Sequence, residues 1–177
     1  VIARRRERLT QLHEESMYPL RTLDGDITEP KFLEEFVYLL QATSPDVRML
    51  VNAAGVGSNG TTADLAEIND RLQPEMVRLN CEALLDMTQK VLPYLSEKSR
   101  IINLASGAAF CPQPGFAVYA ATKSFVLSFS RALGRELKKK KIYVTAVCPG
   151  PVATEFFASD TMKIAAWKKP FLADPNA

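Results

Sequence analysis

Apolar residues along the chain fall into continuous runs and periodic runs, and the two kinds alternate. Continuous runs predict buried strands, at 47–52, 99–104 and 142–147. Between them, apolar residues recur every three or four positions, which predicts amphipathic helices at 5–17, 30–42, 63–70, 74–95 and 118–138. The start of the chain reads like the end of a strand, and 18–23 is a weaker strand candidate.

This alternation predicts an α/β fold with a doubly wound parallel sheet. Strands that are apolar throughout are typical of a sheet covered on both faces. The length of 177 residues suits one domain, so 1–177 is predicted to be a single domain. In such sheets, ligands bind outside the carboxyl ends of the strands. Residues 52–55, Ser106 and 149–150 all follow predicted strands, so we expect a binding site there.

The composition excludes several classes of function. Apolar residues make up 47% of the chain, charged residues 24%, and the net charge is +2, so we expect no nucleic-acid partner. The cysteines Cys81, Cys111 and Cys148 have no CxxC spacing, and His13 lies in a charged helical segment, so neither a disulfide framework nor a metal site is expected. No apolar run approaches the ~18 residues of a membrane span. Cysteines without a disulfide pattern fit a reducing cytosol, so we expect a cytoplasmic protein.

The segment 106–123, SGAAFCPQPGFAVYAATK, contains Ser106, Tyr119 and Lys123. The spacing of Tyr119 and Lys123 places both side chains on one helix face. An ammonium beside a phenol favours the phenolate, so we expect Lys123 to lower the pKa of Tyr119 from about 10. Such a tyrosine exchanges a proton with an alcohol or ketone near neutral pH. Alternatively, this spacing marks a helix surface, and Ser106 is only a loop cap.

Together with other motifs, these residues resemble the short-chain dehydrogenase/reductase (SDR) family. The motifs are NAAG at 52–55, Asn80 within MVRLNCEAL, Ser106 thirteen residues before Tyr119, Lys123, and PGPVAT at 149–154. The resemblance runs from Val1 to about Thr154 and implies a Rossmann-like, dinucleotide-binding catalytic domain. It implies an enzyme that moves a hydride between a nicotinamide cofactor and the carbonyl or hydroxyl carbon of a small molecule.

The resemblance also implies roles for single residues. Tyr119 would be the general acid, Lys123 would hold the nicotinamide ribose, and Ser106 would bind the substrate oxygen. Asn80 would position a water that relays protons to the lysine, although its spacing fits a mid-helix residue with local bonds equally well. Residues implied to bind the cofactor are Arg4, Arg5, Asp26, Ile27, Asn52, Ala53, Gly55, Tyr119, Lys123, Pro149, Gly150, Val152 and Thr154.

The start of the chain favours NADP(H) over NAD(H). Members of the family that use the 2′-phosphorylated cofactor carry arginine just beyond the second strand, where NAD users carry an acidic residue. Here Arg4 and Arg5 follow 1–3, and an arginine fork suits a phosphate monoester. The alternative is a solvated basic helix start, although cations are disfavoured there. Asp26 resembles the family acid that bonds the adenine, and Ile27 would line its pocket.

The chain departs from the family pattern at both ends. The family begins with a strand and a T-G-x-x-x-G-x-G loop that cradles the pyrophosphate, and neither is present before Val1. A sheet without that strand would leave backbone groups unpaired in its core, so we expect roughly 35–40 residues to precede Val1. The family continues with more helix and a final strand after Asp160, so 166–177 is expected to be incomplete. Ala53 replaces the second Asn of the usual NNAG.

Two further hypotheses stay open: a catalytically inactive NADP(H)-binding sensor or scaffold, and a truncated chain that exchanges strands with a copy. Retention of the four polar residues argues against the first. Apolar residues near the site favour a lipophilic substrate (a 3-oxoacyl chain, a steroid-like ketone or a small carbonyl), namely Ala108, Ala109, Phe110, Phe116, Phe156 and Phe157. The resemblance implies a homodimer or homotetramer packed through the helices at 74–95 and 118–138. Some apolar residues of these helices would then lie in the core and others in the interface, namely Met76, Leu84, Phe125 and Phe129.

Overall fold

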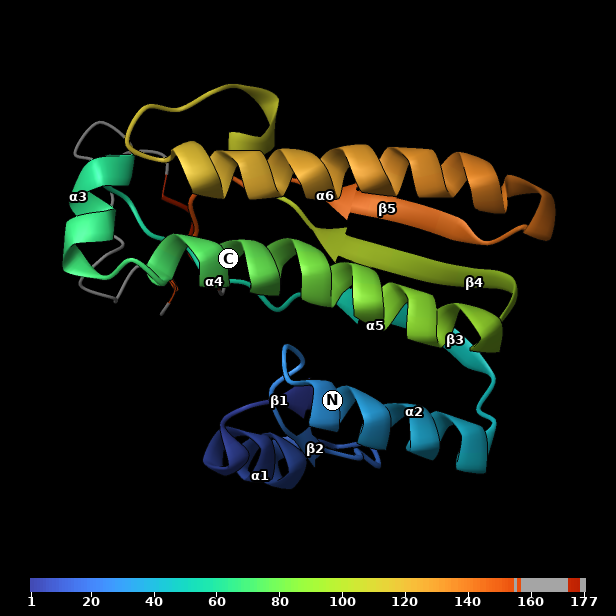
Figure 1. Ribbon diagram of the computed structural model, residues 1–177. Helices are drawn as coiled ribbons and strands as arrows, with labels where there is room; N and C mark the ends of the chain where they lie inside the picture. Colours follow the sequence, from blue (N-terminus) through green and yellow to red (C-terminus); the bar gives the residue numbers. More distant parts are fainter. Residues whose placement is uncertain (155, 157–171, 176–177) are drawn as a thin grey trace. The chain divides into compact units, whose positions relative to one another are not determined.

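The computed structural model describes residues 1–154, 156 and 172–175, in two compact units, Val1–Pro45 and Asp46–Ala177 (Figure 1). The elements are β1 (Ile2–Ala3), α1 (Arg6–Glu15), β2 (Leu23–Asp24), α2 (Pro30–Thr43), β3 (Val47–Asn52), α3 (Thr62–Ile68), α4 (Leu72–Val77), η1 (Arg78–Ala83), α5 (Leu84–Val91), η2 (Leu92–Tyr94), β4 (Leu95–Leu104), η3 (Gly107–Phe110), α6 (Ala117–Glu136), η4 (Leu137–Lys140) and β5 (Tyr143–Val147). Within the described ranges, no helix is long and apolar enough to cross a membrane.

The smaller unit pairs β1 with β2 in parallel and contains the helices α1 and α2. The strand predicted at 18–23 is wrong in extent, because only Leu23 of that range pairs with β1. Phe32 and Phe36 of α2 are buried. Gly25 follows β2 because a Cβ there would lie 2.0 Å from the Phe32 ring. The chain reversal after β2 therefore depends on a residue without a side chain.

The larger unit contains a parallel sheet in the order β3-β4-β5. The three predicted strands are confirmed, although β4 begins at Leu95 rather than at 99. Asn52 lies opposite Asn103, and Asn103 lies opposite Ala146, so the three strands end level with one another. The loops that follow them consequently start from the same edge of the sheet.

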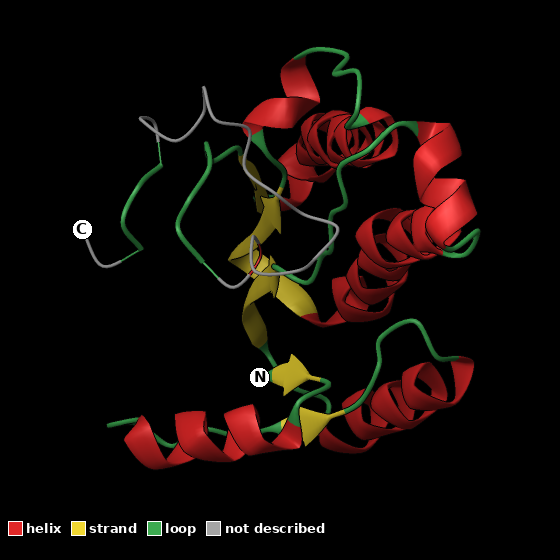
Figure 2. Ribbon diagram, turned by 90° about the vertical axis from the view of Figure 1, so that its left-hand side faces the viewer, coloured by secondary structure: helices red, strands yellow, loops and turns green. Residues whose placement is uncertain are grey.

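Helices of the larger unit cover one face of this sheet (Figure 2). Ile101 of β4 and Val126 of α6 are completely buried between the layers, with 0% of their surface exposed. Met49, Val51 and Tyr143 alternate with the inward positions and are 51%, 49% and 53% exposed. The expectation that the strands are buried on both faces is therefore not met at these residues. The reason is that the crossovers of this unit place α4, α5 and α6 on one side.

The long helix predicted at 74–95 is interrupted. It starts as α4 at Leu72, passes through the π-helical turn η1, and continues as α5. Asn80 lies in η1 and is 1% exposed. Since π-helical turns often occur at functional sites, the interruption marks Asn80 for closer inspection. The helix predicted at 118–138 is confirmed as α6, followed by η4.

Candidate active site

The loops that follow β4 and β5 are hydrogen-bonded to each other. The backbone N–H of Ala105 donates to the Val147 carbonyl at 2.8 Å, and that of Gly107 donates to the Pro149 carbonyl at 2.9 Å. Ser106 lies between these two bonds, and its Oγ accepts a hydrogen bond from the backbone N–H of Ala108 at 3.1 Å. Ser106 thus caps η3, as one hypothesis had it, and is held beside the Pro149 segment.

Tyr119 lies in the first turn of α6 and is 8% exposed. Its ring packs edge-on against Phe116, with centroids 5.3 Å apart, and tilts against Phe156 at 5.8 Å. Burial raises the pKa of Tyr119, and a hydrogen bond with Ser106 acts to lower it. The structure thereby brings together Ser106 and Tyr119, as the sequence predicted.

Lys123 is also buried, but its ammonium does not act on Tyr119 as expected. Nζ donates a 2.8 Å hydrogen bond to the Leu104 carbonyl at the end of β4 and lies 5.8 Å from the centre of the Tyr119 ring. Burial lowers the pKa of Lys123. The predicted lowering of the Tyr119 pKa by Lys123 is wrong for this structure. Burial is the larger influence on the phenol, and the ammonium bonds to a backbone carbonyl instead.

Asn80 connects three segments. Its Oδ1 accepts from the backbone N–H of Val56 at 2.9 Å, and its Nδ2 donates to the Val56 carbonyl at 2.9 Å and to Thr122 Oγ1 at 3.1 Å. These partners lie 24 and 42 residues away, so its bonds are not local. Gly55 lies against the same group: a Cβ there would be 3.1 Å from Asn80 Oδ1 and 3.4 Å from Lys123 Nζ.

Asn52 takes part in a second buried polar network. Its Nδ2 donates to Thr88 Oγ1 at 3.0 Å and to Asn103 Oδ1 at 2.9 Å, and Asn103 in turn donates to Ser130 Oγ at 2.9 Å. The hydroxyls of Thr88 and Ser130 donate to carbonyls of their own helices. The side chain of Asn52 therefore ties β3 to α5 and β4. The neighbouring Ala53 is exposed at the strand end.

In the smaller unit, the residues predicted to select the cofactor lie together. Arg4 Nη1 is 3.6 Å from Asp26 Oδ2. Asp26 Oδ1 accepts hydrogen bonds from the backbone N–H and the hydroxyl of Thr28 at 2.9 and 2.7 Å. Burial acts to raise the pKa of Asp26, but these bonds and the Arg4 charge outweigh it and lower the pKa. Arg5 is exposed at the start of α1, and Ile27 is partly buried.

The segment after β5 contributes Pro149 through its carbonyl. Among the residues that the structure describes, no atom lies within 4 Å of where a Cβ of Gly150 would stand. Val152 forms a parallel bridge to Ala173, and its carbonyl accepts a hydrogen bond from the Thr154 N–H at 2.8 Å. Phe157 lies outside the described residues, as does most of the predicted C-terminal segment 166–177. The described residues hold no group of three or more His, Cys, Asp or Glu side chains placed to bind a metal ion.

A family model described as short chain dehydrogenase matches residues 1–164. The chain belongs to this family. Among curated relatives, it is 36% identical over 162 residues to an NADP-dependent 3-hydroxy acid dehydrogenase of Salmonella typhi, covering 90% of this chain and 64% of the relative. It is 35% identical to a serine 3-dehydrogenase of Agrobacterium fabrum, covering 86% of this chain and 61% of the relative. The chain thus spans less than two thirds of the length of these relatives.

Solved structures of other short-chain dehydrogenases share the fold. A short-chain dehydrogenase from Sphingobium yanoikuyae in complex with NADPH aligns with a TM-score of 0.81 and 27% identity, covering 98% of this chain and 68% of that one. Serine dehydrogenase from Escherichia coli aligns with a TM-score of 0.74 and 34% identity, covering 85% and 69%. The predicted Rossmann-like, doubly wound α/β fold is confirmed.

The site of this short-chain dehydrogenase contains groups that fit a dinucleotide. An ammonium has three N–H donors, and Lys123 uses one on Leu104, with no other acceptor for it among the described residues. At Gly150 of the same unit, no described atom stands within 4 Å of a Cβ position, which leaves room for a ligand beside Pro149. In the smaller unit, taken by itself, the exposed guanidinium of Arg4 has N–H donors that suit a phosphate oxygen.

Sequence reasoning missed the hydroxyl that joins Asn80 to α6. Thr122 is 2% exposed and follows Tyr119 by three positions, which places it toward the core side of the helix. Its place in the sequence between Tyr119 and Lys123 was the one feature that could have drawn attention to Thr122. It could not be interpreted without knowing that Asn80 faces it.

Proposed function

We propose that this short-chain dehydrogenase is an NADP(H)-dependent oxidoreductase that reduces a carbonyl or oxidises a secondary alcohol. The observation that carries the proposal is the cluster of Ser106, Tyr119 and Lys123 at the carboxyl ends of β4 and β5. A buried phenol and a buried ammonium both cost folding free energy, which a purely structural helix would avoid. NADP(H) is supported by the relative named as NADP-dependent, by the neighbour bound to NADPH, and by the Arg4–Asp26 pair.

In this proposal the chain supplies binding and proton transfer, and bound NADP(H) supplies or accepts the hydride. The Tyr119 hydroxyl gives its proton to the carbonyl oxygen during reduction. Burial keeps this phenol protonated, as the reducing direction requires. The Ser106 hydroxyl bonds the same oxygen and stabilises the charge that develops on it. The two remaining N–H donors of Lys123 bind the nicotinamide ribose.

The substrate class follows from what surrounds the tyrosine. Phe116 and Phe156 both pack against its ring and favour a substrate with an apolar group next to the carbonyl. The relatives' names instead point to short hydroxy acids. We therefore propose a 3-oxo or 3-hydroxy compound, and a panel that runs from 3-oxo acids to aromatic ketones identifies which end is preferred.

The test is NADPH oxidation by the full-length protein, compared with Tyr119→Phe. Loss of the proton donor lowers turnover by about 10²–10⁴-fold, while NADPH binding, followed by fluorescence, is retained. The control is Tyr143→Phe, since Tyr143 is 53% exposed on β5 and lies beneath Arg100. NADPH binding without turnover on any substrate in the panel supports the alternative hypothesis, an inactive sensor or scaffold.

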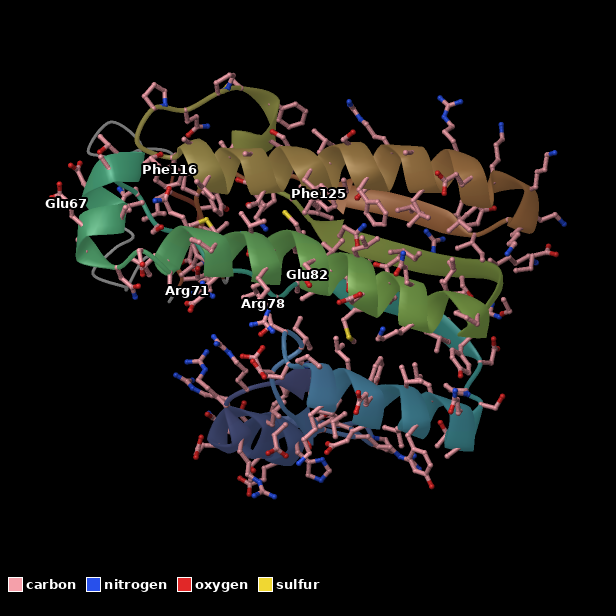
Figure 3. The ribbon with its side chains drawn as sticks, in the orientation of Figure 1. Glu67, Arg71, Arg78, Glu82, Phe116 and Phe125 are labelled. Atoms are coloured by element: carbon pink, nitrogen blue, oxygen red, sulfur yellow. The ribbon has the colours of Figure 1, made fainter. Side chains whose placement is uncertain are left out.

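A homodimer or homotetramer packed through residues 74–95 (α4, η1 and α5) and α6 completes the proposal. Met76 and Leu84 lie in the core of the unit, at 2% and 5% exposed. Phe125, labelled on α6 in Figure 3, is 39% exposed. Its ring stacks on Phe129, with centroids 6.0 Å apart. A surface aromatic pair of this kind supports a helix–helix interface. Phe125→Glu should yield monomers in light scattering, whereas Tyr38→Glu, at a 72% exposed position on α2, should not.

A further inference from the structure

Thr122 occupies an unusual position in the catalytic helix. Its side chain is 2% exposed, and in the sequence it stands between the proposed proton donor, Tyr119, and the proposed ribose ligand, Lys123. Its hydroxyl donates a 2.8 Å hydrogen bond to the Tyr119 carbonyl and accepts one from Asn80 Nδ2 at 3.1 Å. The single hydroxyl therefore holds both its own helix turn and a side chain from η1.

The amide of Asn80, which bonds that hydroxyl, is also held by Val56. Asn80 uses one Nδ2 hydrogen on the Val56 carbonyl and the other on Thr122, while its Oδ1 accepts from the Val56 N–H. The loop that Asn80 holds includes Gly55, and a Cβ atom built on Gly55 would lie 3.4 Å from Lys123 Nζ. Because Asn80 is 1% exposed, water has little access to replace any of these bonds.

We infer that Thr122 is a positioning residue: its hydroxyl fixes the turn of α6 that carries Tyr119 and Lys123 against Asn80 and the Gly55 loop. Neither Asn80 nor Thr122 bonds the Tyr119 hydroxyl or the Lys123 ammonium among the described contacts, so the effect is transmitted through the helix turn. The expected effect on kcat rests on the proposed function. The expected effect on the position of the helix turn rests on geometry alone.

The molecule contains a matched control for this arrangement. Thr88 on α5 is 1% exposed, donates to the Leu84 carbonyl at 2.7 Å and accepts from Asn52 Nδ2 at 3.0 Å. Its burial and its two hydrogen bonds match those of Thr122, but it lies on α5 and not on the helix turn that carries Tyr119 and Lys123. Thr122→Val and Thr88→Val therefore remove the same hydroxyl from the same kind of site. Thr122→Ser keeps the hydroxyl and serves as the rescue variant.

The experiment combines kinetics with a titration that needs no turnover. In Thr122→Val we expect kcat to fall about tenfold relative to Thr88→Val, with Thr122→Ser within about twofold of the wild type. In parallel, the phenol of Tyr119 is titrated by ultraviolet difference spectra against Tyr119→Phe. Since burial raises its pKa, unseating the turn in Thr122→Val should move that pKa down, toward its ordinary value. Thr122→Ser and Thr88→Val should leave it in place.

The outcomes separate this inference from the proposed function. A protein without turnover whose Tyr119 pKa still moves in Thr122→Val contradicts the proposed function and supports the positioning role. An active protein in which Thr122→Val and Thr88→Val have equal kcat and equal titrations overturns the positioning role. If Thr122→Val does not fold, Thr122→Ala and Thr122→Ser are compared with Thr88→Ala and Thr88→Ser in the same two measurements.

Discussion

Two asparagines of the larger unit, Asn103 and Asn80, are equally buried and similarly hydrogen-bonded, but only one of them lies near a charged side chain. Asn103 is 0% exposed, accepts from Asn52 and donates to Ser130. Asn80 is 1% exposed, and its amide bonds Val56 and Thr122. The hydroxyls around Asn103 donate in turn to helix carbonyls, so the network closes on neutral groups. Burial and hydrogen bonding alone consequently do not distinguish a functional amide from a structural one.

The difference is the charge beside Asn80. A Cβ at Gly55 would lie 3.1 Å from Asn80 Oδ1 and 3.4 Å from Lys123 Nζ, so the amide and the buried ammonium both border the same glycine. Burying that ammonium with a single backbone acceptor costs stability. We interpret the Asn103 network as holding the sheet together and the Asn80 group as holding the proposed catalytic residues, Tyr119 and Lys123, in place. The following variants test this interpretation.

Replacing each asparagine with alanine should have the largest effect. Asn103→Ala should lower the free energy of unfolding by about 2 kcal/mol, because Asn52 and Ser130 both lose a buried partner, and leave kcat/KM per folded molecule unchanged. Asn80→Ala should cost a similar amount of stability and also lower kcat/KM about 100-fold, since the loop and α6 separate. Urea unfolding and NADPH oxidation measure the two effects. Equal loss of activity in both variants would contradict the comparison.

A methyl group at Gly55 should have the next largest effect. In Gly55→Ala the new carbon would stand 3.1 Å from Asn80 Oδ1 and 3.4 Å from Lys123 Nζ, so the amide or the ammonium must move. We expect kcat/KM to fall about tenfold with little change in stability, measured by the same two assays. The control is Gly134→Ala, whose methyl group would meet Val144 Cβ at an ordinary 3.5 Å. Unchanged activity in Gly55→Ala would show that the spacing around Lys123 is not critical.

The pH dependence of stability should distinguish the two networks further. Burial lowers the pKa of Lys123 below 10.5, so between its folded pKa and 10.5 the unfolded chain binds more protons, and stability rises with pH. The cost of burying the ammonium is fully present below the folded pKa. Any stability that Lys123→Met gains should therefore be larger at about pH 7 than at about pH 10.

Thermal unfolding of Lys123→Met and wild type at both pH values measures this difference. Tyr119 acts in the opposite sense, because its raised pKa makes stability fall as pH rises above 10.0, but it is present in both proteins and cancels. Asn103→Ala contains no titrating change, so its stability difference from wild type should not vary with pH. A pH-independent difference for Lys123→Met would mean that the ammonium is not desolvated.

The sequence predicted the parts of the site that depend on chain order. Strand ends, the helix that carries Tyr119 and Lys123, and the loop that carries Ser106 all follow from apolar periodicity and motif spacing. The sequence did not predict the hydrogen-bond partners of each asparagine side chain. Asn52 belongs to a motif implied to bind the cofactor, yet its side chain bonds Thr88 and Asn103. Such pairings join residues up to 51 positions apart, and no local pattern encodes them.

The prediction that the pKa of Tyr119 is lowered was wrong for a related reason. An i, i+4 spacing fixes that two side chains share a helix face, but not where a flexible ammonium finds its acceptor. The Leu104 carbonyl, 19 residues earlier in the chain, takes that bond. The effect of burial likewise depends on Phe116 and Phe156, which pack on the ring only in the folded chain.

The smallest expected effect comes from Gly134→Ala, which raises stability without touching either network. Glycine inside a helix costs about 0.5–1 kcal/mol relative to alanine, and the new methyl group finds ordinary contacts with Val144 Cβ at 3.5 Å and its carbonyl oxygen at 3.8 Å. The midpoint of urea unfolding should rise while kcat/KM stays at the wild-type value. If activity instead rose with stability, then the losses in Asn80→Ala and Gly55→Ala would reflect loosening of the whole unit. An unchanged kcat/KM leaves the placement of Tyr119 and Lys123 as their cause.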